Sequence, residues 1–362
     1  MDRYKPRKMT PEEPESNKEG ELKFEFGVVC RSKKDLGFEL KPERENEKNG
    51  DNFIALPKIG VFAVLDGVGK NEDPSQASTL AKYFLEARLK NAEGLGLKET
   101  IDFLKELGLA VDKFLYSLSN FKKKKYKLLE NKSINTTLTL AKIWRDPNNP
   151  KDIKIITINA GDSRVYLADV GARKLEQLTT DNSEFVIPKD YAQNVLELEA
   201  DAPDLKRIFD DATTAEELLW IQDWFVYMKK KYGLDFTFLP EMYFEHRNVI
   251  TAYLGMGDGL EEELGVEVKN LSLEKEQKFK SSVSQVADNL LTKAREVALT
   301  YYSSDELCEE RSKPDDMTSL VVDIKIGDVV IGRLALTSDG IHDNLTLKQM
   351  EEAVFGGTGL TK

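Results

Sequence analysis

Two aspartates in this 362-residue chain stand directly after apolar, strand-like runs, and each is followed by glycine. They are Asp66 in Phe62-Ala-Val-Leu-Asp66-Gly67 and Asp339 in Leu334-Ala-Leu-Thr-Ser-Asp339-Gly340. A carboxylate in this position lies at the end of a sheet, where glycine lets the backbone turn and lets a carbonyl oxygen approach a ligand. Asp-Gly is also a common turn, so turn chemistry explains either pair taken alone.

Further aspartates stand beside other apolar runs, which turn chemistry explains less well. Asp51 precedes one such run, Asp162 lies in a Gly-Asp-Ser-Arg turn, and Asp315 and Asp316 precede another run. Mg²⁺ and Mn²⁺ prefer carboxylate, carbonyl and water oxygens as ligands. The pattern therefore indicates a cation site built from aspartates at strand ends.

The composition is that of a globular protein and argues against some functions. Apolar residues make up 40% of the chain and charged residues 32%, as in a protein with a substantial core. The net charge of −12 argues against a general nucleic-acid binder, because phosphate backbones are held by clustered Lys and Arg. The basic run Lys122 to Lys125 is either a solvated helix end, where lysines favour the helix dipole, or a docking patch for an acidic partner.

Neither a membrane span nor a secretion signal is expected. Apolar stretches such as Val329 to Leu336 are far shorter than the roughly 18 residues that a span needs. Met1 to Gly20 lack the pattern of a signal peptide. Cys30 and Cys308 have neither metal-ligand spacing nor a disulfide framework, which fits a reducing compartment. We therefore expect a cytoplasmic protein.

Residue periodicity predicts the elements that position the acids. Residues 1–21 are charged and aperiodic, which is typical of a mobile tail. Residues 185–244, with a capping box at Thr214 to Glu217, are interpreted as an inserted helical segment. We expect one catalytic domain over 22–362 with an α+β fold, an antiparallel β-sandwich flanked by helices on both sides. Strands are predicted at 23–29, 52–56, 61–65, 136–143, 153–159, 164–168, 318–324 and 329–336, and helices at 75–91, 98–124, 273–302 and 347–354.

Several motifs together resemble the metal-dependent protein phosphatases, also called the PPM or type 2C family. The resemblance covers most of the chain from Phe24 to Lys362 apart from the insertion. The matching segments are Asn49-Gly-Asp51-Asn52, Val64-Leu-Asp66-Gly67-Val68-Gly69, Asn135-Thr-Thr-Leu-Thr139, Asn159-Ala-Gly-Asp-Ser-Arg164, Leu178-Thr-Thr-Asp181-Asn182-Ser183, Pro314-Asp-Asp-Met-Thr318 and Ser338-Asp-Gly-Ile-His-Asp343.

The resemblance implies an activity and its cofactors. It implies a serine/threonine phosphatase in which two or three Mg²⁺ or Mn²⁺ ions activate the water that attacks a phosphorylated protein. The same resemblance implies which residues act. Asp51, Asp66 and Arg44 would serve in catalysis, with Lys48 as an alternative to Arg44 for binding the phosphate. The implied metal ligands are Asp51, Asp66, the Gly67 carbonyl, Asp315 and Asp339 for two ions, and Asp162, Asp343 and Asp339 for a third.

The order of the last two motifs is exchanged relative to the family, because Asp315 here precedes Asp339. A short connection from Lys325 to Asp328 is compatible with adjacent antiparallel strands. Such a hairpin would place both aspartates at the same end of the sheet and so preserve the site.

Another departure concerns proton transfer, and the chain's histidines do not replace the missing group. Val68 stands where many relatives have histidine, which removes a candidate proton donor. His246 and His342 are expected to be structural, and Arg164 is expected to brace the turn that carries Asp162.

Two other functions stay open. Val68 and the exchanged motif order favour a catalytically inactive scaffold or regulatory protein, and a small-molecule phosphomonoesterase would use the same ligands. The insertion lies where relatives carry a flap beside the active site. Its aromatic residues Trp220, Trp224 and Tyr227 are either core packing or a surface on which a partner docks.

Overall fold

The structure is a computed structural model that describes nine segments of the chain, namely 21–38, 48–68, 74–126, 133–170, 172–182, 250–257, 259–271, 277–301 and 315–356. Several expectations lie outside these residues: nearly all of the N-terminal tail, Arg44, Cys308, His246 and the insertion at 185–244.

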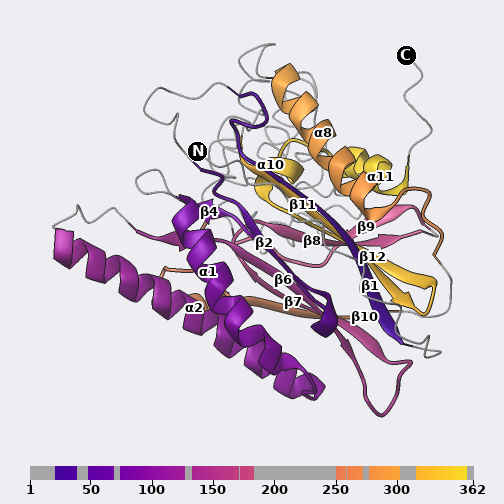
Figure 1. Cartoon of the computed structure of the whole chain (residues 1–362), viewed down its shortest axis with the longest axis horizontal. Coiled ribbons are helices and arrows are strands. Elements are labelled where there is room, and N and C mark those ends of the chain that lie inside the picture. The colour runs from indigo at the N-terminus through magenta and orange to yellow at the C-terminus, as the bar shows by residue number, and fades with distance from the viewer. Residues whose placement is uncertain are drawn as a thin grey trace, which may run out of the picture.

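Two antiparallel five-stranded sheets form the centre of the described chain (Figure 1). The first has the order β1-β11-β12-β8-β9 and the second the order β10-β7-β6-β3-β2. The strands of the first sheet are β1 (Leu22–Arg31), β11 (Met317–Ile326), β12 (Val329–Thr337), β8 (Arg164–Asp169) and β9 (Lys174–Gln177). Those of the second are β10 (Gly265–Leu271), β7 (Ile153–Ala160), β6 (Leu138–Arg145), β3 (Val61–Leu65) and β2 (Asn52–Leu56), and a separate short pair consists of β4 (Gly67–Val68) and β5 (Asn135–Thr136).

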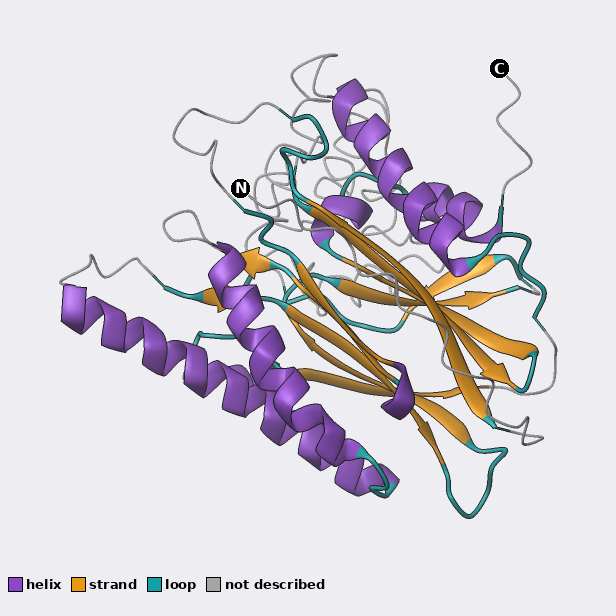
Figure 2. Cartoon of the chain, viewed as in Figure 1, coloured by secondary structure: helices purple, strands orange, loops and turns teal. Residues whose placement is uncertain are grey.

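Helices cover the outer face of each sheet, so the layers run helix, sheet, sheet, helix (Figures 1 and 2). Helices α1 (Pro74–Leu89) and α2 (Leu97–Tyr126) pack on the second sheet, and α8 (Val283–Tyr301) and α11 (Leu347–Phe355) on the first. The shorter helices are η2 (Pro57–Ile59), η3 (Lys90–Ala92), α7 (Leu260–Glu263) and α10 (Asp339–His342). The expected α+β sandwich with helices on both sides is confirmed.

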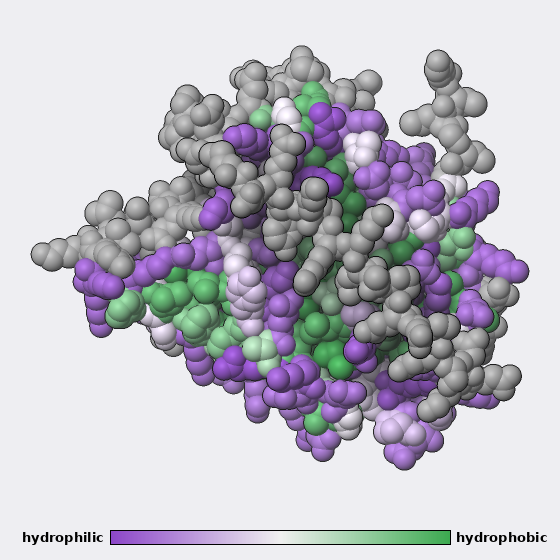
Figure 3. Space-filling view, in the orientation of Figure 1, coloured by the Kyte–Doolittle hydropathy of each residue, from purple (hydrophilic) through white to green (hydrophobic). Residues whose placement is uncertain are grey.

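The alternation of side chains along buried strands explains this layering. On β3, Val61, Ala63 and Leu65 pack against α1 and α2, whereas Phe62 and Val64 face the other sheet. Successive side chains of a strand point to opposite faces, so a strand that is apolar at every position is buried on both. Hydrophilic side chains gather at the outer edges of the face in Figure 3, with hydrophobic ones toward its middle.

None of the helices in the described ranges has the length and apolar character that crossing a bilayer requires.

The strands predicted at 52–56 and 61–65 are confirmed, and they form a hairpin. β2 and β3 pair antiparallel with Asn52 opposite Leu65. The turn between them is a short 3-10 helix that ends at Gly60, whose φ of 61° is one that glycine adopts without strain. Helices α1 and α2 begin and end within about two residues of their predicted limits.

One predicted helix start is wrong, and strands β9 and β10 were not predicted. The helix expected from 273 begins only at Val283, because Ser282 caps it: the Gln285 N–H donates to Ser282 Oγ (3.3 Å), and the Ser282 N–H donates to Gln285 Oε1 (2.9 Å). β10 is an edge strand in which charged residues interrupt the apolar pattern, so its sequence carries little strand signal.

Candidate metal centre

Asp51 and Asp66 lie at one end of the second sheet. Asp51 directly precedes β2 and Asp66 directly follows β3, and these strands are antiparallel neighbours. In an antiparallel pair, the start of one strand lies beside the end of the next. The two carboxylates are therefore brought together by the hairpin between them.

The exchanged motifs form the same arrangement in the first sheet. β11 and β12 are antiparallel with Ser319 opposite Thr337, and the Ser338 N–H donates to the Thr318 carbonyl (3.1 Å). A Cβ added to Gly340 would lie 2.2 Å from the Asp316 carbonyl oxygen, so the turn after β12 packs directly on the segment before β11. The expectation that the hairpin places the two motifs at the same end of the sheet is confirmed.

Asp316 joins the two sheets at this end. Its Oδ2 accepts the Gly50 N–H (2.6 Å), and its Oδ1 accepts the Lys33 N–H (2.7 Å). Burial raises the pKa of the Asp316 carboxyl, and the two backbone donors oppose that rise. Because Gly50 immediately precedes Asp51, this carboxylate holds the segment that carries a candidate ligand.

The thiol of Cys30 lies behind Asp51. Its Sγ accepts hydrogen bonds from Asn49 Nδ2 and Thr318 Oγ1, both at 3.0 Å, and donates to the Asp51 carbonyl (3.7 Å). Asn49 Oδ1 in turn accepts the Asp51 N–H (3.0 Å). Burial, followed by the charge of Asp51, raises the pKa of the Cys30 thiol to about 12, so the thiol stays protonated at neutral pH.

The Asp51 carboxyl is buried among other acids. The residue is 3% exposed, and none of the described residues makes a hydrogen bond of normal distance and angle to either carboxylate oxygen. Burial raises the pKa of this carboxyl to about 8, with further rises from Asp316 and Asp339, although the hydroxyls of Ser338 and Thr318 oppose them. A carboxyl group in this state is poorly solvated when charged, and a bound cation would stabilise its charged form.

The Asp66 backbone is fixed while its carboxyl faces other acids. Its N–H donates to Thr137 Oγ1 (2.9 Å), and its carbonyl accepts the Thr137 N–H (2.7 Å) and Thr136 Oγ1 (2.8 Å). Although part of the residue remains accessible to solvent, the surrounding protein raises the pKa of its carboxyl well above the usual range. The carboxylates that raise it further are, in order, Asp339, Asp51, Asp315 and Asp162.

Gly67 permits a close approach that another residue would prevent. A Cβ at this position would lie 2.2 Å from the Pro74 carbonyl oxygen and 2.9 Å from that of Gly50. The Gly67 N–H donates to the Gly50 carbonyl (3.2 Å). Glycine here therefore seats the start of α1 against the loop that carries Asp51.

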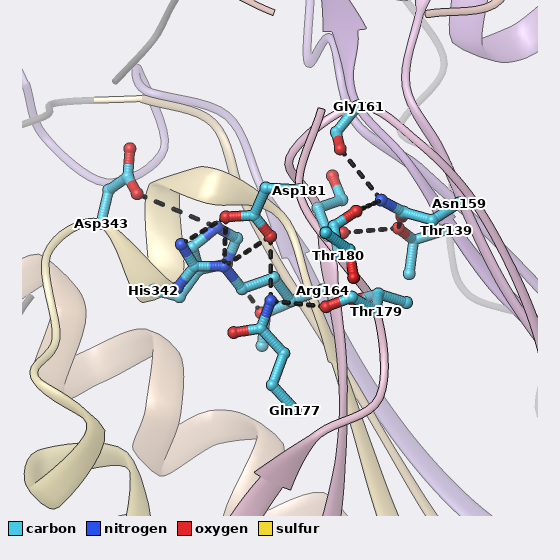
Figure 4. Close-up of polar contacts among 12 residues, drawn as sticks. Thr139, Asn159, Gly161, Arg164, Gln177, Thr179, Thr180, Asp181, His342 and Asp343 are labelled. Carbon is cyan, nitrogen blue, oxygen red and sulfur yellow. Dashed lines mark hydrogen bonds and ion pairs between the residues drawn. The ribbon is translucent and has the colours of Figure 1, made fainter. Parts of the chain in front are cut away.

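The Gly-Asp-Ser-Arg turn places Asp162 between β7 and β8, where the residue is 4% exposed. Arg164 pairs with Asp181: its Nη2 lies 2.7 Å from Oδ2, and its Nε lies 3.1 Å from both oxygens (Figure 4). Gln177 Nε2 donates to the same carboxylate (2.9 Å). Arg164 thus braces the turn as expected, and its partner is Asp181.

Asp343 follows α10, one helical turn after Asp339, whose carbonyl accepts the Asp343 N–H (2.9 Å). Its Oδ1 lies 3.9 Å from Nε2 of His342 (Figure 4). His342 is 4% exposed, and its Nδ1 lies 3.0 Å from Thr337 Oγ1. This burial and contact fit the structural role expected for His342.

The acids gather, but they do not form a closed site. Among the described residues, no three His, Cys, Asp or Glu side chains lie close enough together to hold a metal ion. Asp315 Oδ1 instead lies 2.7 Å from the Lys33 ammonium. Charged carboxylates repel one another, so bringing several into one coordination sphere requires a cation between them. The donor set fits Mg²⁺ or Mn²⁺ in its chemistry, since Asp51 offers two buried oxygens that make no hydrogen bond of normal geometry with the described residues.

Sequence reasoning missed the residues that hold the candidate ligands in place, namely Cys30, Lys33 and Asp316. Cys30 was noted only as lacking metal-ligand spacing, and Asp316 only as part of a motif. The adjacency of Asp315 and Asp316 was a signal that one of the two carboxylates has a role other than binding the ion.

No protein-family model matches the chain, and no curated protein matches it. Among solved structures it aligns with PppA, a regulatory component of the type VI secretion system (T6SS) in Pseudomonas aeruginosa, at 16% identity and a TM-score of 0.45, over 84% of this chain and 100% of that chain. It aligns with the PPM Ser-Thr phosphatase MsPP from Mycobacterium smegmatis at 17% identity and a TM-score of 0.39, over 87% and 97% of the two chains. The catalytic domain of the phosphatase PstP with two manganese ions aligns at 16% identity and a TM-score of 0.40, over 84% and 99%. The family named for MsPP is the one that the sequence motifs resemble.

Proposed function

We propose that the chain is a metal-dependent protein serine/threonine phosphatase that hydrolyses phosphomonoesters. The observation that carries the proposal is the state of Asp51, a buried carboxyl whose oxygens make no hydrogen bond of normal geometry with the described residues and whose pKa is raised to about 8 by burial and by neighbouring acids. A buried carboxylate is costly in a folded protein unless a cation or hydrogen-bond donors compensate its charge. A divalent cation is the compensating partner that this donor chemistry fits.

Two cations held by Asp51, Asp66, the Gly67 carbonyl, Asp315 and Asp339, with a third at Asp162, Asp339 and Asp343, would supply Lewis-acid chemistry to the phosphoryl oxygens and lower the pKa of the attacking water. The chain's own contribution is to position these donors. Hydrogen bonds from Thr136 and Thr137 fix the Asp66 backbone, and Asp316 fixes Gly50 beside Asp51. Fixed backbones reduce the reorganisation that binding requires.

Val68 leaves no proton donor of its own at the position where many relatives have histidine. It pairs with Asn135 in the short sheet β4-β5. We infer that water or another acid protonates the leaving group. Arg44, or Lys48 in its place, is proposed to bind the phosphate.

The substrate is proposed to be a phosphorylated protein in the cytoplasm, with a partner docking through residues 185–244. The phosphorylated substrate and the flap position of residues 185–244 follow from the motif resemblance, whereas the cytoplasmic compartment follows from the cysteine usage. A phosphatase for small phosphomonoesters would use the same donors and differs only in what surrounds them.

A catalytically inactive scaffold or regulatory protein is the second candidate. Two observations favour it: Val68 in place of histidine, and the absence from the described part of the chain of three acidic, histidine or cysteine side chains in metal-binding proximity. The raised pKa values of Asp51 and Asp66 favour the enzyme, because perturbed carboxyls are typical of functional sites.

Turnover of a generic phosphomonoester with and without metal separates these functions. We expect hydrolysis with Mn²⁺ or Mg²⁺, its loss in chelator, and no rescue by Zn²⁺, since the donors are oxygens. Turnover that survives the chelator would contradict the metal dependence, and Mn²⁺ binding without turnover would favour the inactive scaffold. Phosphopeptides tested beside phosphorylated metabolites then distinguish the two enzymes.

A crystal structure with Mn²⁺ tests the ligand assignment directly. If Asp315 and Asp339 bind one ion, their nearest carboxylate oxygens lie within about 5 Å, twice a metal–oxygen distance of roughly 2.0–2.6 Å. A larger separation would exclude a shared ion and with it this part of the site.

A further inference from the structure

Lys33 brings a cationic side chain to Asp315, one of the carboxylates proposed to bind metal. Its Nζ lies 2.7 Å from Asp315 Oδ1, and the two side chains are 20% and 27% exposed. Ions that are largely shielded from solvent are screened less by salt than exposed pairs. The Lys33 ammonium therefore neutralises part of the negative charge of the neighbouring aspartates.

The backbone of Lys33 is fixed at this place. Its N–H donates to Asp316 Oδ1 (2.7 Å), and the turn behind it is closed by the Leu36 N–H, which donates to the Ser32 carbonyl (3.0 Å). Leu36 is 3% exposed and packs in the core beneath α8. The backbone of the lysine is thus held in place, so rotation of the Lys33 or the Asp315 side chain is what separates the pair.

Lys33 and a bound cation require the same carboxylate. Lysine carries a compact point charge on a flexible stem of four carbons, so the ammonium can leave without a backbone change. Other carboxyl groups lie near Asp315, because its charge raises the pKa of Asp66 and of Asp316. A divalent ion compensates more negative charge than the ammonium does, which favours exchange when metal is present.

We propose that Lys33 is an internal counterion of the metal centre, which occupies Asp315 when the cation is absent and is displaced when it binds. The inference rests on the proposed function only in taking Asp315 as a ligand. Its consequence is that Lys33 weakens metal binding and raises the cation concentration at which the site fills, while it limits repulsion among the acids of the empty site.

Calorimetric titration of chelator-treated full-length protein with Mn²⁺ tests the proposal without relying on turnover. For Lys33→Gln we expect the dissociation constant to fall by about tenfold or more. Lys33→Arg, which keeps the charge, should stay within about threefold of the wild type. The matched control is Lys34→Gln, an equal loss of charge at the next, exposed residue, and it should change the constant by less than about twofold. Circular dichroism of each variant confirms folding.

A second comparison isolates the ion pair. In an Asp315→Asn background, adding Lys33→Gln should bring no further tightening, because the competition is already removed. Unchanged or weaker Mn²⁺ binding by Lys33→Gln overturns the proposal, as does an equal gain in Lys34→Gln, which would reflect net charge alone.

The outcome is separable from that of the proposed function. If the wild type binds Mn²⁺ but does not hydrolyse phosphomonoesters, the proposed enzymatic function is wrong. The titrations of the Lys33 variants still decide whether the counterion assignment is correct. If none of the variants binds Mn²⁺, the counterion assignment is overturned as well.

Discussion

Replacing Asp51 by asparagine should stabilise the metal-free protein near neutral pH while abolishing its response to metal. The wild-type carboxyl is buried and makes no hydrogen bond of normal geometry with the described residues, and its pKa is raised from 3.8 to about 8 in the folded chain. Asparagine has nearly the same shape but does not ionise. The substitution therefore removes an electrostatic penalty that only a bound cation would otherwise relieve.

The sign and size follow from proton linkage. A carboxyl whose folded pKa lies above its unfolded value favours folding fully below pH 3.8, and this contribution is lost as the pH rises to about 8. At about 1.36 kcal/mol for each pKa unit, the loss is on the order of 4 kcal/mol at pH 7. A buried amide that lacks partners costs about 1–3 kcal/mol, so the net gain in Asp51→Asn is about 1–3 kcal/mol.

Urea unfolding in chelator at pH 5 and pH 8 measures the effect. The free energy of unfolding of the wild type should fall between these pH values by more than that of Asp51→Asn. With Mn²⁺ added, the wild type should gain stability and the variant should not, because mass action stabilises only the protein that binds.

Asp316→Asn is the contrasting variant. Its carboxylate accepts the Gly50 and Lys33 N–H groups, so an amide keeps one acceptor and turns a donor toward the other N–H. We expect the free energy of unfolding to fall by about 1–3 kcal/mol, in place of a rise.

An Asp51→Asn protein that is less stable than the wild type at pH 8, or whose free energy of unfolding keeps the wild-type dependence on pH, would refute the reasoning.

Three further predictions concern neighbouring residues. Asp66→Asn should retain less than a tenth of wild-type turnover with Mn²⁺, which corresponds to a barrier increase above about 1.4 kcal/mol. Turnover above a tenth of the wild-type rate would show that Asp66 is not a catalytic residue. Gly67→Ala should lower the free energy of unfolding by about 1–3 kcal/mol, because its Cβ would lie 2.2 Å from the Pro74 carbonyl oxygen, and an unchanged urea midpoint would contradict this contact. In a Cys308→Ser background, Cys30 should resist iodoacetamide at pH 8 in the native protein and react in urea, because its pKa of about 12 keeps the native thiol protonated. Rapid labelling of the native protein, detected by mass spectrometry, would contradict the raised pKa.

The sequence alone determined most of the elements and the candidate ligands. Alternating or continuous apolar residues predicted most strands, and the three-to-four-residue period predicted α1 and α2. Asp66 and Asp339 were recognisable because each follows an apolar strand and precedes glycine. Even the exchanged motif order could be reconciled in advance, since four residues between two strands favour a hairpin, and a hairpin fixes which strand ends meet.

Only the tertiary structure decided the environment of those ligands. The surroundings of the Asp51 carboxyl depend on how the two sheets meet. The same packing decides that Asp316, and not Asp315, accepts the Gly50 N–H. Lys33 and Asp315 are 282 residues apart in sequence, and no local pattern links them. Periodicity reports which face of an element is apolar, whereas a pKa, an ion pair or an unpartnered oxygen depends on atoms that distant segments bring within a few ångströms.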